Sequence, residues 1–126
     1  MVYKHIVMWK FKEQHNGKSA LENARWMKEQ LEGLVGVVPE LLSAEVGISP
    51  ALEQAAGAPA PVAAQSNAAA VPAQAASGEY DACLVSTFAS PEALAAYKVH
   101  PKHKAISAYC KEARLKRLAF DWWSEE

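Results

Sequence analysis

Apolar and polar side chains alternate along residues 2–11, and a repeat of two residues is the signature of a β-strand. One face of this strand would carry Tyr3, His5, Val7, Trp9 and Phe11. The other face would carry Val2, Lys4, Ile6, Met8 and Lys10. Both faces contain large apolar groups, so we expect a strand that is covered on both sides.

Similar strand patterns return three times, at residues 41–48, 80–88 and 115–123. Helical patterns lie between them. Ser19 and Glu22 fit a capping box, and apolar residues then recur at helical spacing up to Leu34. Ser90 followed by Pro91 predicts the start of a second helix, and His100 followed by Pro101 predicts a further helical piece over 101–114.

The predicted order is strand, helix, strand, strand, helix, strand, which is the ferredoxin-like α+β arrangement with a four-stranded antiparallel sheet. Helices can cover only one face of that sheet. We expect Ile6 and Met8 to pack against the helices. The face with His5, Val7, Trp9 and Phe11 would then need a second copy of the chain as its cover, because so much apolar surface is unfavourable in water.

The segment from about 49 to 78 differs in composition from the rest of the single domain, residues 1–126. Half of residues 51–76 are alanine, three are proline, and Glu53 carries the only charge. Prolines interrupt any long helix there. We therefore expect an insertion that forms a surface loop between two strands.

Charge and cysteine content exclude several classes. The net charge is −1, with 13 basic and 14 acidic residues, so the basic field that nucleic acid requires is missing. No apolar run approaches the roughly 20 residues of a membrane span. The two cysteines, Cys83 and Cys110, are too few for a disulfide framework, and we expect both to be small buried apolar groups. We expect a cytoplasmic protein without nucleic-acid or membrane partners.

Three segments resemble the stress-responsive A/B barrel (Dabb) family, a branch of the dimeric α+β barrels. They are "VYKHIVMWKFKE", "YDACLVSTFASPEALAAYKVHPKHKA" and "RLAFDWW". The likeness covers nearly the whole chain outside the insertion. It implies a homodimer in which two sheets form a barrel with internal cavities, and it implies no cofactor. The family includes plant stress-induced proteins, bacterial proteins of unassigned role and a plant polyketide cyclase.

The resemblance also implies candidate site residues. In the cyclase branch, the positions that match Tyr97 and His103 carry the chemistry, and the position that matches His5 lines the same cavity. A histidine base can remove a proton next to a carbonyl near neutral pH, and a tyrosine hydroxyl can hold that carbonyl. Further cavity-lining residues would be Val7, Trp9 and Phe88. The chain departs from that branch at Ala82, where the cyclase has another cavity histidine.

Two other interpretations of the "HPKH" run stay open. In the first, His100 is only the cap of a helix, and His103 forms a hydrogen bond within the cavity wall. A metal site is disfavoured, since zinc needs three or four ligands and Lys102 and Lys104 would repel a cation. The expected function is to hold a small, mostly apolar or aromatic molecule. The alternatives are a cyclase-like or isomerase-like enzyme that uses Tyr97 and His103, and a structural stress protein whose interior is packed shut.

Overall fold

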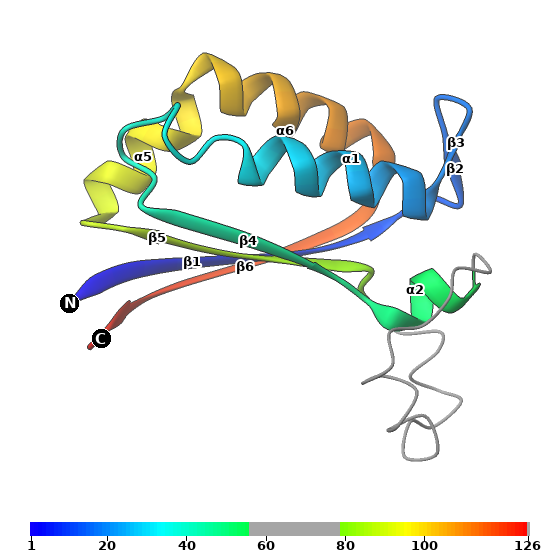
Figure 1. The fold of residues 1–126 in the computed structure, drawn as a ribbon, viewed down its shortest axis with the longest axis horizontal. Coiled ribbons are helices and arrows are strands. Elements are labelled where there is room, and N and C mark those ends of the chain that lie inside the picture. The colour runs from blue at the N-terminus through cyan, green and yellow to red at the C-terminus, as the bar shows by residue number, and fades with distance from the viewer. Residues whose placement is uncertain (56–78, 126) are drawn as a thin grey trace.

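The computed structural model of the protein describes residues 1–55 and 79–125. One antiparallel sheet of four strands, in the order β4-β5-β1-β6, forms the body of the molecule (Figure 1). The strands are β1 (Val2–Phe11), β4 (Ser43–Ile48), β5 (Ala82–Phe88) and β6 (Arg114–Ser124). The main helices are α1 (Ala20–Glu32), α5 (Pro91–Val99) and α6 (Pro101–Ala113). The predicted ferredoxin-like order is thereby confirmed.

All three main helices lie on the same side of the sheet (Figure 1). Beneath them, the inward side chains of β1 are buried, and they alternate with half-buried ones along the strand. The buried positions of β1 include His5, Val7, Trp9 and Phe11. Strand β5 adds Ala82, Leu84 and Phe88 to the same core, so the core lies between the helices and the two central strands.

The prediction of which face the helices cover is wrong. His5, Val7 and Trp9 lie under the helices of their own chain, and Ile6 and Met8 point to the uncovered face. The reason lies in the charges on the uncovered face. Lys4 and Lys10 share that face with Ile6, and taking their ammonium groups out of water beneath the helices would cost more than leaving some apolar area wet.

The helix starts follow the predicted local chemistry. The Ser19 hydroxyl accepts a hydrogen bond from the Glu22 amide at 3.1 Å, and the Glu22 carboxylate accepts one from the Ser19 amide at 3.1 Å. Ser90 caps α5 by accepting from the Ala93 amide at 3.1 Å. His100 caps α6, since its Nδ1 accepts from the Lys102 amide at 3.1 Å. All three predicted caps are confirmed.

A small hairpin precedes α1 and was not predicted. Strands β2 (Gln14–His15) and β3 (Lys18–Ser19) are joined by two residues with positive φ, Asn16 at 56° and Gly17 at 75°. Asn-Gly is the pair that a two-residue hairpin turn prefers, because both positions need the left-handed region. The dipeptide in the sequence was the signal that could have identified this turn.

The first residues of the predicted insertion at about 49–78 are helical. Residues Pro50–Ala55 form a short helix, α2, and Leu52 packs partly buried against the core. The remainder of the predicted loop, 56–78, lies outside the described residues. The strand on its far side, β5, starts at Ala82 rather than residue 80, since the Asp81 carboxylate is turned inward to accept from the Phe11 amide at 2.9 Å.

Candidate functional site

A cavity of about 230 Å³ lies between the sheet and the last two helices. Its floor comes from β1 and β5, and its wall comes mainly from α6, so the alternation of β1 and the helical spacing of α6 together place the lining side chains. The lining residues are His5, Val7, Trp9, Leu31, Leu84, Lys98, His103, Ile106, Ser107, Cys110, Arg114 and Arg117. Among the sequence-predicted residues, His5, Val7, Trp9 and His103 meet here.

His5 is buried on the cavity floor and is held by a carboxylate of the neighbouring strand. It lies opposite Asp121 in the β1–β6 register, and its Nδ1 donates to Asp121 Oδ1 at 2.5 Å. Burial lowers the pKa of His5 below its usual range, although the hydrogen bond and charge of Asp121 oppose this effect. His5 is therefore neutral at pH 7, and its Nε2 carries the lone pair.

His103 enters the cavity from the first turn of α6. Its Nδ1 lies 3.2 Å from the Lys98 carbonyl oxygen, and a carbonyl only accepts, so Nδ1 carries the proton. Burial lowers the pKa of His103, and the charges of Arg117 and Lys98 lower it further, against the hydrogen bond to the Lys98 carbonyl. Both cavity histidines therefore combine an engaged Nδ1–H with an Nε2 that is free to accept a proton.

Tyr97 and Phe88 stand next to the cavity and are not among its lining residues. The Tyr97 ring packs against the His103 ring, with centroids 4.3 Å apart, and against Phe88, with centroids 5.1 Å apart. The Tyr97 hydroxyl is buried and has no hydrogen-bond partner among the described residues. Burial raises the pKa of Tyr97 above its usual range, so the hydroxyl keeps its proton and can donate it.

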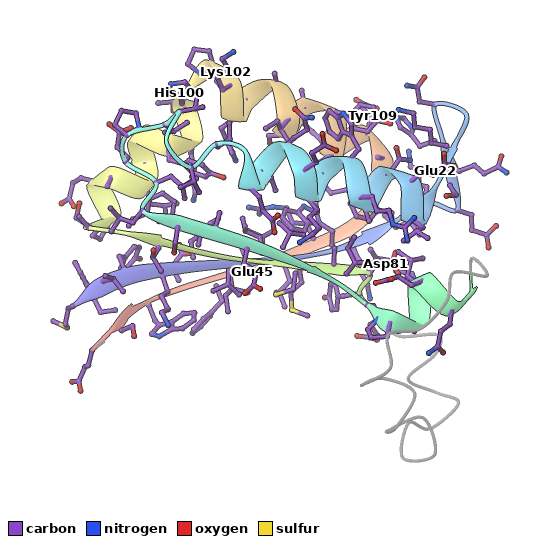
Figure 2. All side chains as sticks on the ribbon, viewed as in Figure 1. Glu22, Glu45, Asp81, His100, Lys102 and Tyr109 are labelled. Carbon is purple, nitrogen blue, oxygen red and sulfur yellow. The ribbon has the colours of Figure 1, made fainter. Side chains whose placement is uncertain are left out.

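The other features considered in the sequence do not take part in the chemistry of His5 and His103. Figure 2 shows His100 with Lys102 at the junction of α5 and α6, on the side of the helices that faces away from the sheet. Cys110 lines the cavity, but burial raises the pKa of its thiol to about 12, so it is an apolar part of the wall at neutral pH. Across residues 1–55 and 79–125, no three His, Cys, Asp or Glu side chains gather as metal ligands would.

The sequence interpretation missed the other charged residues of the site. Asp121 was counted only as a position in the last strand, and Lys98, Arg114 and Arg117 were not singled out. A lone acidic residue inside the aromatic run "AFDWW" was the available signal for Asp121. Its partner could not be read from the sequence, because the pairing of the first and last strands joins residues 116 positions apart.

Comparison with known protein families gives a match along most of the chain. A family model described as the Stress responsive A/B Barrel Domain matches residues 3–66 and 64–124. No curated protein matches the chain. None of the described helices is long and apolar enough to cross a membrane.

Solved structures support the same fold at low sequence identity. A dimeric ferredoxin-like protein of unknown function from Bacteroides fragilis is 20% identical, with 98% of this chain and 96% of that chain covered and a TM-score of 0.70. A hydroxynitrile lyase from Passiflora edulis is 16% identical over 99% of this chain and 95% of that one, with a TM-score of 0.64. A Dabb family protein from Mesorhizobium loti is 13% identical over 99% and 98%, with a TM-score of 0.61.

Proposed function

Since this chain belongs to the stress-responsive A/B barrel family, we propose that it binds a small apolar or aromatic molecule in the cavity beneath α6. The observation that carries the proposal is the pair His5 and His103, two neutral rings with engaged Nδ1 atoms that line one cavity together with large apolar side chains. Histidines that only stabilised the fold would need no shared cavity between them.

The size of the cavity supports a ligand of about one ring. Trp9, Leu31 and Leu84 form part of its lining and leave about 230 Å³ open. An engineered apolar cavity of roughly 150 Å³ in another protein is enough to bind benzene. The competing interpretation, a structural stress protein with its interior packed shut, would require these large side chains to fill that volume.

A second function, proton transfer, is favoured by the state of the two histidines. Asp121 orients His5 as a carboxylate orients the histidine of a catalytic triad, and the Lys98 carbonyl does the same for His103. Either Nε2 can take a proton from a carbon next to a carbonyl, which is the first step of a cyclase-type or isomerase-type reaction. Tyr97 does not line the cavity, so its role in this reaction would be to position the His103 ring, against which it packs.

One experiment with acetophenone, an aryl ketone, in D₂O tests both functions. Binding is followed by shifts of protein NMR resonances. We expect Ser107→Trp, which adds bulk to the cavity lining, to abolish the shifts of the cavity resonances. Ala108→Trp, an equal change at the next and non-lining position of α6, should preserve them. Binding that survives Ser107→Trp unchanged would exclude the cavity as the site.

Proton transfer is followed in the same samples by loss of the ketone methyl proton signal. We expect the protein to catalyse this exchange and His103→Gln to slow it by about 10²-fold, the usual contribution of a general base. His100→Asn keeps a helix cap and removes a histidine outside the cavity, so its rate should match the native protein. Equal rates in both variants would remove the base role while leaving the binding function intact.

A further inference from the structure

The mouth of the cavity carries positive charge from two different elements. Lys98 comes from the last turn of α5, and Arg114 and Arg117 come from the start of β6. None of the described lining residues is acidic. The cavity therefore has an apolar floor and a cationic rim, which is the arrangement that suits an amphipathic anion.

No ion pair among the described residues uses these three cations. The described ion pairs use other basic groups, namely His5, Lys10, Arg25, Lys28 and Lys116. The negative charge of Asp121 acts on Arg117, and one oxygen of Asp121 accepts the hydrogen bond from His5. Three cations beside one carboxylate leave net positive charge where a ligand would enter.

The cations also act on the groups inside the cavity. The charges of Lys98 and Arg117 contribute to lowering the pKa of both His5 and His103, after burial as the main cause. Both cations line the same cavity as the two rings. Arg117 itself is the neighbour of Trp9 in the β1–β6 register, and both residues line the cavity.

We propose that the ligand is a small carboxylic acid, bound as its anion, with one apolar ring or a chain of similar size. This assignment rests on the proposed binding function and adds the substrate class. The ring lies against Trp9, Leu84 and Ile106, and the carboxylate lies at the rim between Arg117 and Lys98. Arginine suits this task, because its planar guanidinium donates two parallel hydrogen bonds to a carboxylate.

Benzoate and benzamide form the test pair, because they have the same shape and differ in charge. Binding is measured by NMR titration at fixed pH and salt, with the Trp9 indole and His103 ring resonances as reporters of position. We expect benzoate to bind at least about tenfold tighter than benzamide, as a charge-assisted contact provides. Arg117→Gln should weaken benzoate about tenfold and leave benzamide unchanged.

Two further variants make the outcome unambiguous. Lys98→Gln should weaken benzoate selectively as well, and Lys111→Gln, an exposed lysine on α6 that does not line the cavity, should weaken neither ligand. Equal affinity for benzoate and benzamide, or equal loss of both in Arg117→Gln and Lys98→Gln, overturns the carboxylate assignment and leaves the cavity function standing. Binding of neither compound at the reporter resonances overturns both.

Discussion

At the scale of single residues, the site depends on how each histidine is held. His5 and His103 come from opposite ends of the chain, and each uses Nδ1 to bind an acceptor, a carboxylate in one case and a backbone carbonyl in the other. Fixing one nitrogen fixes both the tautomer and the ring orientation. The same two residue types in water would share their proton between both nitrogens and offer no defined base.

This burial has a consequence for stability against pH. A histidine whose pKa is lower in the folded state than in the unfolded chain binds fewer protons when folded, so folding stability rises with pH. The contribution of His103 is fully present above its unfolded pKa of 6.5 and is lost as the pH falls through 6.5 toward the lowered folded value. His5 acts in the same direction.

We therefore expect the free energy of unfolding to fall between pH 7.5 and pH 5, with a slope of at most about 1.4 kcal/mol per pH unit per histidine. Urea unfolding at fixed protein concentration measures it. His103→Gln should make this dependence shallower, and Lys104→Gln, an exposed neighbour on α6, should leave it unchanged. A native protein that becomes more stable on acidification over this range would contradict the lowered pKa values.

At the scale of elements, local chemistry determined the starts of the helices. Ser19, Ser90 and His100 each satisfy a backbone amide that the first turn leaves free, and each could be recognised from a few neighbouring residues. The bounds of the strands were similarly close to the predicted ones, because alternation is a local signal.

What the sequence could not provide is the contact between distant elements. Alternation along β1 separates His5 from Ile6, but it does not say which of the two faces receives the helices, and here the assignment was wrong. That choice depends on the lysines of β1 together with residues on β4 and β6. The pair His5 and Asp121 and the cationic rim depend on strand pairing in the same way, which explains why the histidines were predicted and their partners were not.

The cap of α6 allows a direct measurement at this scale. His100 is an unusual capping residue, and its Nδ1 replaces the side-chain oxygen that serine or asparagine would provide. We expect His100→Ala to lower the free energy of unfolding by about 1 kcal/mol, and His100→Asn to restore most of that loss. Urea unfolding of the two variants compares them. If the alanine variant were as stable as the native protein, the hydrogen bond to the Lys102 amide would contribute nothing to α6.

At the scale of the whole molecule, one face of the sheet carries apolar side chains that no helix covers. Figure 1 shows α1, α5 and α6 together on the opposite side. The uncovered face carries Ile6 and Met8 from β1, Val85 from β5, and Leu118 and Phe120 from β6. Leu118 is 51% exposed and Phe120 is 65% exposed, so this apolar surface is largely in contact with water in the single chain.

A second copy of the chain would cover that face. Similar solved structures from Bacteroides fragilis and Thermobifida fusca are described as dimeric, although their identities of 20% and 18% relate them to this chain by fold alone. We therefore still expect a homodimer, but its interface would lie on the sheet face with Ile6 and not on the predicted face with His5. The sheets would meet through Ile6 and Phe120, with His5 and Trp9 remaining inside each copy.

We expect the native protein to be a dimer at micromolar concentration, with about twice the 13.7 kDa of one chain in size-exclusion chromatography with light scattering. Phe120→Glu should raise the dissociation constant by at least about 10²-fold, because a two-fold axis repeats the change and each buried phenylalanine contributes roughly 1.5–3 kcal/mol. Val99→Glu is the matched control: Val99 is also 65% exposed, but it lies on α5 away from this face. A native monomer, or equal dissociation in the two variants, would mean that the uncovered face is not the dimer interface.

Retained acetophenone binding by the Phe120→Glu monomer would further show that each cavity is complete within one chain, as the lining residues of β1, α6 and β6 imply.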